Sequence, residues 1–430
     1  MRYHVSLNAL VLSLLLAVCS GCTVGRKGFD WPSWRGPAGN GISKESGWNP
    51  KALAAGPKIL WQLDVGQGYS SVVIQGNLLI TTGMKDGKYT VFCLAADSGK
   101  PIWQYTFEDF NPAQATPAID KDSVYALSWE GILLCLDAQN GKLHWQKDLV
   151  ADYGAVRPSY GFSGSPVIAG ELLVLTANTA GMALRKKTGE LVWNSGPPPA
   201  KIKAFDPESS TGADYATPVI YAQGSKKNAL IVSWKGISSV AVETGQPLWV
   251  YEWELYSGRH ITDPVVTGKR IYLADNYKDP SLPGSLLLEV KSNTPTVLWK
   301  SPDLYTEISN AVIVDGHIYG GQGGPYKYSA SLRCVDLETG KLKWERIMSE
   351  AMFIGCVSLM AADGKLIILT DDGMLVIAEA SAEGYKEISR CEVPKGETGI
   401  AKFWTAPVLC NGRIYCRNYY GELVCIDVSK

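Results

Sequence analysis

A short motif, a small polar residue–Gly–polar residue–x–x–Trp, occurs five times in this chain and constrains its fold more than any other feature. In each copy, a glycine that can adopt positive φ and a neighbour that can bond its own backbone favour a tight turn, and the Trp lies in the strand that follows. A motif that recurs at roughly 40- to 60-residue intervals indicates a repeat architecture. The copies are Ser98–Trp103, Asn140–Trp145, Thr188–Trp193, Thr244–Trp249 and Thr339–Trp344.

A second motif marks the start of an apolar strand in each repeat. It is a small or polar residue followed by Pro or, in three degenerate copies, by a small or apolar residue. The spacing between Pro117 and Pro407 corresponds to about 48 residues per repeat, close to the length of a four-stranded propeller blade. The copies are Ser70-Ser71, Thr116-Pro117, Ser165-Pro166, Thr217-Pro218, Asp263-Pro264, Asn310-Ala311, Cys356-Val357 and Ala406-Pro407.

These repeats predict an all-β chain that folds as an eight-bladed β-propeller of four-stranded antiparallel blades. Asn411-Gly412 between two short apolar runs is a strong hairpin signal, and no long apolar period of 3.6 residues follows residue 21. The last repeat lacks its outer strand, so we expect Pro57–Leu63 to supply it and close the ring, because an open ring would expose sheet edges. Seven blades plus an irregular segment is the alternative.

The first 21 residues have the features of a secretory signal peptide. Arg2 precedes an apolar run, Ala9–Val18, that is too short to span a membrane. Small residues before Cys22 resemble a bacterial lipobox, which predicts lipidation of Cys22 and a position on the periplasmic side of the outer membrane. The expected divisions are a signal peptide at 1–21, a lipidated tether and strap at 22–56 and the propeller at 57–430. Cleavage to a free periplasmic protein is the alternative.

The tether contains a dense aromatic knot, Asp30–Pro37, with two Trp residues and an Arg. This composition is not that of a flexible linker. We expect the knot to pack on the propeller as a strap or cap, and a partner-binding motif is the alternative.

The cysteines are expected to be buried thiols that pack as small hydrophobic residues. Four of them, Cys93, Cys135, Cys334 and Cys425, occupy one repeat position in different blades, and such positions are poor disulfide partners. A link between Cys356 and Cys391 within blade seven stays open as an alternative.

Composition and motifs argue against several classes of function. The net charge is −1 and the pI is about 6.5, so no general nucleic-acid surface is expected. The histidines His144, His260 and His317 lack the spacing of metal ligands, and no metal site is predicted. Gly161–Gly164 is one residue short of a hydrolase nucleophile elbow, so no catalytic residue is assigned there.

The Gly-polar-x-x-Trp turns that close four-stranded repeats resemble the quinoprotein-type, pyrroloquinoline-quinone-like propeller repeat. The opening Trp31–Pro37 and the segment Gly66–Ser71 are similar to envelope proteins of this repeat class, including the BamB-like lipoproteins. The resemblance covers nearly all of residues 57–430 and implies that the Trp residues dock between neighbouring blades. Those residues are Trp61, Trp103, Trp145, Trp193, Trp249, Trp299 and Trp344.

The resemblance leaves two branches of the superfamily to distinguish. The quinone-dependent alcohol dehydrogenases carry an adjacent Cys-Cys disulfide and a calcium site, and this chain has no Cys-Cys pair. The absence favours the non-catalytic lipoprotein branch, in which no cofactor is expected. A quinone-binding oxidoreductase with Ca²⁺ is the alternative, and it predicts a stacking Trp129 or Trp234 and a cation ligand such as Asp371. Glycan binding is a weaker alternative.

A binding site is expected on the loop face, which we define as the face formed by the loops leading into the inner strands and those joining the two middle strands of each blade. Aromatic residues and Arg dominate binding hot spots, and Arg157 and Arg259 are the first candidates to engage a carboxylate. The expected partner is an envelope protein or peptide, bound by a monomer within a complex. The candidate residues are Trp129, Arg157, Tyr160, Asp214, Tyr215, Trp234, Arg259, His260, Asp263, Glu307, Asn310 and Trp404.

Overall fold

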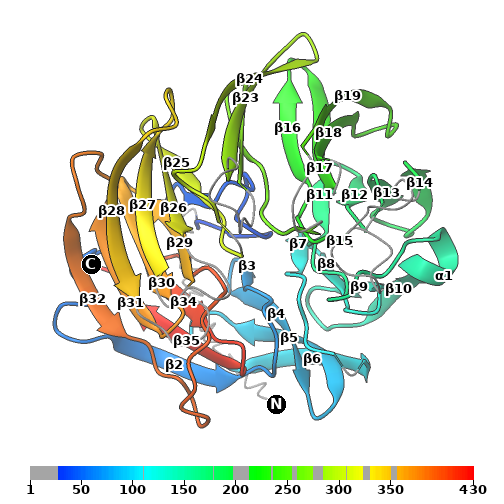
Figure 1. Cartoon of the computed structure of the whole chain (residues 1–430). Helices are drawn as coiled ribbons and strands as arrows, with labels where there is room; N and C mark the ends of the chain where they lie inside the picture. The colour runs from blue at the N-terminus through cyan, green and yellow to red at the C-terminus, as the bar shows by residue number, and fades with distance from the viewer. Residues whose placement is uncertain are drawn as a thin grey trace, which may run out of the picture.

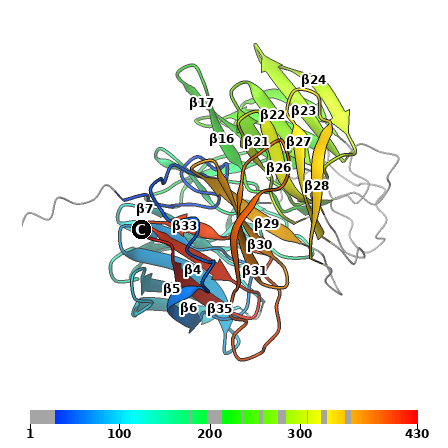
Figure 2. The same ribbon diagram turned by 90° about the vertical axis from the view of Figure 1, so that its left-hand side faces the viewer.

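The blades are arranged in a ring in this computed structural model, as Figure 1 shows, and Figure 2 shows the same ribbon turned by 90°. We use the word channel for the region enclosed by the innermost strands of the blades. The structure describes residues 28–109, 111–177, 179–196, 213–233, 236–253, 259–274, 284–306, 308–322, 330–349 and 356–430. Within these ranges no helix has the length and apolar character needed to cross a membrane.

Eight antiparallel blades follow one another along the chain, each with its first strand innermost. The eight-bladed propeller predicted from the repeats is therefore confirmed. Blades one to three comprise β3 (Val73–Gln75), β4 (Leu78–Lys85), β5 (Lys88–Ala95) and β6 (Pro101–Glu108); β7 (Ala118–Asp120), β8 (Ser123–Leu127), β9 (Ile132–Asp137) and β10 (Leu143–Asp148); and β11 (Val167–Ala169), β12 (Leu172–Leu175), β13 (Met182–Arg185) and β14 (Leu191–Asn194). A short helix, α1 (Leu149–Tyr153), follows β10.

Blades four to six repeat the pattern, with a two-stranded parallel pair in the loops beside them. The pair is β15 (Ala213–Asp214) and β20 (Arg259–His260). The blades comprise β16 (Val219–Gln223), β17 (Lys226–Ser233), β18 (Gly236–Ala241) and β19 (Pro247–Glu252); β21 (Val265–Thr267), β22 (Arg270–Ala274), β23 (Ser285–Lys291) and β24 (Thr294–Ser301); and β25 (Val312–Val314), β26 (His317–Gln322), β27 (Ala330–Asp336) and β28 (Leu342–Ser349).

The last two blades each include a segment from the N-terminal region. The short β1 (Ile42–Ser43) pairs in parallel with the inner strand of blade seven, and β2 (Lys58–Asp64) pairs with the last strand of blade eight. The blades comprise β29 (Val357–Ala362), β30 (Lys365–Thr370), β31 (Met374–Glu379) and β32 (Glu387–Glu392); and β33 (Val408–Cys410), β34 (Arg413–Arg417) and β35 (Glu422–Asp427). Ring closure by the N-terminal strand is therefore confirmed, and β2 lies beside β35 in Figure 1.

The Gly–Trp motifs join neighbouring blades rather than stabilising their own blade. The motif glycines Gly99, Gly141, Gly189, Gly245 and Gly340 each lie against the Trp ring of the preceding blade, where an added Cβ would be 2.5–2.9 Å from ring atoms. Six of the seven Trp residues also donate their indole N–H to a carbonyl of the next blade at 2.7–3.1 Å. These contacts explain why Gly and Trp recur together.

Two seams between blades depart from this pattern. The first is the seam between blades four and five. There, blade five has Ser292-Asn293 in place of the motif turn. The indole N–H of Trp249, from blade four, has no acceptor among the described residues. Blade seven has no Trp in β32, but Trp48 and Leu53 from the N-terminal segment are buried in the core that blades seven, eight and one share. The N-terminal segment therefore supplies a buried Trp to the core beside blade seven, whose outer strand has none.

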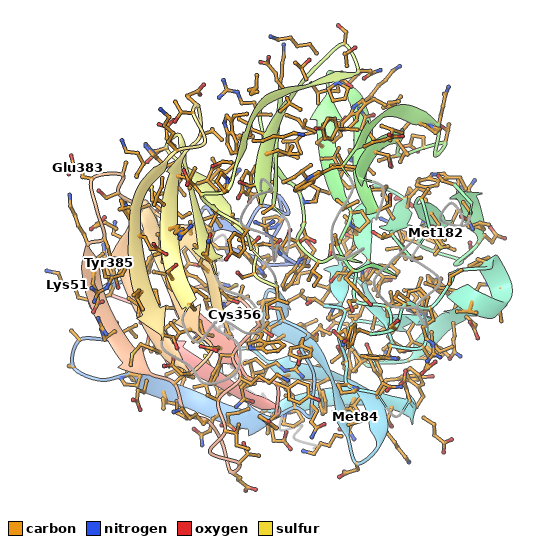
Figure 3. The ribbon with its side chains drawn as sticks, in the orientation of Figure 1. Lys51, Met84, Met182, Cys356, Glu383 and Tyr385 are labelled. Atoms are coloured by element: carbon orange, nitrogen blue, oxygen red, sulfur yellow. The ribbon has the colours of Figure 1, made fainter. Side chains whose placement is uncertain are left out.

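The eight described cysteines are buried thiols. The alternative of a bond between Cys356 and Cys391 is wrong because the two residues lie at opposite edges of blade seven. Cys356 leads into the innermost strand β29 and Cys391 is in the outermost strand β32, with two strands between them. At about 4.8 Å per strand the pair is too far apart to bridge. Figure 3 places Cys356 toward the centre of the ring and Glu383 and Tyr385 at its rim.

Candidate binding face

The residues at the start of the inner strands form a chain of hydrogen bonds around the channel. Each backbone N–H donates to the side chain at the same repeat position in the next blade, at 2.7–3.1 Å. This arrangement explains the small or polar residue of the second motif, because that side chain must accept a bond from its neighbour. The linked residues are Ser71, Thr116, Ser165, Thr217, Asp263 and Asn310.

Asp263 brings a carboxylate into this chain of hydroxyl and amide groups. One oxygen accepts from the Thr217 N–H at 2.7 Å, and the other accepts from Asn310 Nδ2 at 3.1 Å and from the Trp34 indole at 2.7 Å. Burial raises the pKa of Asp263, and the nearby charge of Arg35 opposes that shift. Asp263 and Asn310, which we predicted on the binding face, are therefore engaged in holding the channel wall.

The aromatic knot crosses the channel as a strap. Trp31 pairs with Ile74 in blade one, and the Pro32 carbonyl accepts from Ile119 in blade two. On the opposite side of the ring, Arg35 donates to the Ala311 carbonyl of blade six at 2.5 Å. The strap therefore ties together blades that are not neighbours.

One small cavity lies between the strap and the channel wall. It has a volume of about 30 Å³ and is lined by Trp34, Arg35, Ser71, Asn310 and Trp404, among others. Small-molecule sites usually measure about 300–1,000 Å³. This cavity is therefore too small for a tricyclic quinone.

The quinone alternative also predicts a calcium site. Among the described residues no three His, Cys, Asp or Glu side chains gather in a way that could hold a metal ion. Asp371, the proposed cation ligand, is buried, and its Oδ1 has no hydrogen-bond partner within those residues. Burial raises the pKa of Asp371 to about 6, with the Asp372 carboxylate as a smaller cause.

One cluster of predicted residues does form on the loop face, over blades two to four. Tyr160 is 52 % exposed and packs against Tyr215, with ring centroids 6.1 Å apart. Trp129 lies against Gly161, where the positive φ and absent Cβ allow the ring to approach. Arg157 donates to both oxygens of Glu130 at 2.6 and 2.7 Å. The guanidinium that we expected to be available to a partner is thus already paired, although both side chains remain partly exposed.

The remaining predicted residues are not brought into this cluster. Trp404 lies on the other side of the ring, stacked on Tyr69 at 5.3 Å. Asp214, Arg259 and His260 are described only through the pairing of their backbones in β15 and β20. Cys22, Trp234 and Glu307 lie outside the described residues.

A second loop-face cluster lies around Trp404 and was not identified as a set from the sequence. Tyr69, Lys402, Trp404 and Tyr419 come from three different loops at the seam between blades eight and one. The only sequence signal was the abundance of aromatic residues in those loops. Their convergence depends on ring closure, which a linear pattern does not position.

Comparisons with known proteins agree with this architecture. A family model described as "Outer membrane protein assembly factor BamB" matches residues 51–301 and 235–430. The BamB protein of Yersinia pestis is 24 % identical over 384 residues, which cover 85 % of this chain and 77 % of that protein. The BamB protein of Moranella endobia is 24 % identical over 306 residues, which cover 66 % of this chain and 70 % of that protein.

Solved structures from both branches share the fold. The BamB structure from Moraxella catarrhalis has a TM-score of 0.57 at 16 % identity and covers 86 % of this chain and 97 % of that one. The quinohemoprotein alcohol dehydrogenase from Comamonas testosteroni has a TM-score of 0.64 at 13 % identity, and the match covers 93 % of this chain and 81 % of that one. At these identities the structural likeness shows the fold alone and does not distinguish the branches.

Proposed function

This chain belongs to the outer membrane protein assembly factor BamB family, and from that premise we propose that it is a non-catalytic scaffold that binds envelope proteins through its loop face. The observation that carries the proposal is the cluster of Trp129, Arg157, Tyr160 and Tyr215 on a rigid ring. Exposed Tyr and Arg side chains on loops held by a rigid scaffold are suited to protein recognition.

The oxidoreductase alternative has less support. The cavity between the strap and the channel wall has a volume of only about 30 Å³, and the chain lacks the adjacent Cys-Cys pair of the quinone-dependent alcohol dehydrogenases. No feature of the loop face within the described residues favours a glycan over a peptide. We therefore assign no catalytic residue, and the BamB relatives support a role in outer-membrane protein assembly.

Membrane attachment is part of the same proposal. Residues 1–21 would be removed as a signal peptide, and Cys22 would carry a lipid that anchors the tether at 22–56 and the propeller at 57–430 on the periplasmic side of the outer membrane. The protein would act as a monomer within a complex. Mass spectrometry of the N-terminal peptide tests this, because unmodified Cys22 in membrane-extracted protein would contradict lipidation.

The scaffold role is tested by complementation in cells that lack the chromosomal copy. We expect wild-type protein to restore outer-membrane β-barrel levels and Arg157→Ala/Tyr160→Ala to fail. Val250→Ala is the matched control, because Val250 is similarly exposed, at 57 %, but lies on outer strand β19, away from the loop face. Equal amounts of all three proteins in the membrane fraction are required, and full activity of the double variant would refute the assigned face.

A further inference from the structure

A cation held on aromatic rings lies on the loop face where the ring closes. The ammonium nitrogen of Lys402 is 4.0, 4.5 and 5.2 Å from the ring centroids of Tyr419, Trp404 and Tyr69. Tyr69 stacks on Trp404 with an angle of 13° between the rings, and Tyr420 meets Tyr419 edge to face. We call Tyr69, Lys402, Trp404, Tyr419 and Tyr420 the closure cluster.

The backbone around the closure cluster is held in place before any partner binds. Thr405 donates its hydroxyl to the Tyr69 carbonyl at 3.0 Å, and the Tyr419 N–H donates to the Lys402 carbonyl at the same distance. Beneath Tyr69, the buried Arg417 donates to the carbonyls of Ser70 and Gly66. Such support lowers the entropic cost of binding, because the side chains are already positioned.

Among the described residues, no carboxylate pairs with the charge of Lys402. Within the described part of the chain no ion pair forms at Lys402, and burial alone lowers its pKa, with no acidic neighbour opposing that shift. Lys402 therefore differs from Arg157, whose charge is neutralised by Glu130. Its three N–H donors lie at a half-buried surface beside aromatic rings, and Ile400 in the same loop is 52 % exposed.

We propose that the closure cluster binds a peptide segment in which a carboxylate side chain lies next to an aromatic residue. The carboxylate would accept hydrogen bonds from Lys402, and the aromatic side chain would pack on the rings of Tyr69 and Trp404 and on Ile400. A charge-assisted hydrogen bond at a partly desolvated site is stronger than a neutral one, so the negative charge selects the ligand. The inference rests on the proposed function only in that the ligand is a protein segment, and it adds a second site across the ring from Tyr160.

The probe is the peptide acetyl-Glu-Phe-Glu-amide, added to the full-length protein in detergent micelles and labelled with 5-fluorotryptophan. The ¹⁹F signal of Trp404, assigned by its loss in Trp404→Phe, should shift saturably. The uncharged peptide acetyl-Gln-Phe-Gln-amide should bind about tenfold more weakly, the loss expected for one charge-assisted hydrogen bond. Lys402→Met should weaken the binding of the acidic peptide by a similar factor, whereas Lys402→Arg should retain most of that binding.

Lys341→Met is the control, because Lys341 is exposed on the rim of blade six, away from the cluster. Equal binding of the Glu and Gln peptides, or unchanged binding to a folded Lys402→Met protein, would overturn the proposal. Tighter binding of acetyl-Lys-Phe-Lys-amide would also overturn it, since the rings would then accept a foreign cation in place of Lys402. These outcomes are independent of the complementation by Arg157 and Tyr160 variants, so either proposal can fail alone.

Discussion

The indole N–H of Trp34 donates to the carboxylate of Asp263 at 2.7 Å, across 229 residues of sequence. Trp34 belongs to the strap, and Asp263 lies in the hydrogen-bonded chain around the channel. Because Asp263 is buried, bulk water competes little for its carboxylate. The contact therefore fastens the N-terminal segment to the interior of the ring.

Removing this bond is expected to destabilise the protein. Trp34→Phe keeps an aromatic ring and loses the donor, so it should lower the free energy of unfolding by about 1.5–3 kcal/mol, the usual value for a hydrogen bond to a charged group. Chemical denaturation of Trp34→Phe, Asp263→Asn and the double variant measures the coupling. Strictly additive effects would show that the two side chains do not interact.

The Gly–Trp contact between blades predicts a strongly position-dependent effect of glycine substitution. Gly245 has φ 69°, and an added Cβ would lie 2.5 Å from the Trp193 ring, whereas Gly224 has φ 63° and nothing within 4 Å. Gly245→Ala should therefore destabilise the protein by about 1–3 kcal/mol more than Gly224→Ala, because only the former forces the core apart. Both variants carry the same backbone strain, so similar unfolding midpoints would contradict the contact.

The seam between blades four and five predicts unequal effects of two similar Trp substitutions. Trp193 and Trp249 are both buried, at 8 % and 6 % exposed, but only Trp193 has a described acceptor, the Val242 carbonyl at 2.7 Å. Trp193→Phe should cost about 1 kcal/mol more than Trp249→Phe, since only the former breaks a hydrogen bond. Urea denaturation of the two variants tests this, and a larger loss in Trp249→Phe would refute it.

Asp371 predicts a pH dependence of stability. Its pKa in the folded protein is about 6, above the ordinary value of 3.8, because burial disfavours the charged carboxylate. Between these values the folded state binds more protons than the unfolded state, so the contribution of Asp371 to stability falls as pH rises from about 4 to about 6 and is constant above. The melting temperature of Asp371→Asn should rise relative to wild type across this range. If the difference in melting temperature between Asp371→Asn and wild type did not change with pH, the raised pKa of Asp371 would be excluded.

Arg417 predicts a strong dependence of ring closure on one buried side chain. Its guanidinium donates to the carbonyls of Ser70, Thr82 and Gly66 at 2.6–2.9 Å, joining blade eight to blade one. Arg417→Met leaves these acceptors without donors and should lower the free energy of unfolding by at least about 3 kcal/mol. Arg413→Met, which removes one weak contact at 3.4 Å, is the control and should cost much less. Equal losses of unfolding free energy in the two variants would show that the hydrogen bonds of Arg417 add little to stability.

The sequence predicted the blades, but it did not show which of the candidate site residues have partners within the protein. The motif glycines and the small or polar residues marked the repeats, but their partners lie in neighbouring blades, as with Gly245 and Trp193. Arg157 was expected to engage a carboxylate of a partner, and nothing in the sequence indicated that Glu130, 27 residues earlier, faces it. Asp263 was interpreted as a loop-face residue, although Trp34 and Thr217 enclose it.

The sequence by itself determined the number of blades, their four-stranded form and the strand that closes the ring, because turns and strand periodicity depend on residues close together in the chain. Only the tertiary structure decided which polar and aromatic side chains bind partners within the protein and which remain available at the surface. Tyr69 and Lys402 meet because the ring closes, and the electrostatic environment of a side chain depends on such distant neighbours.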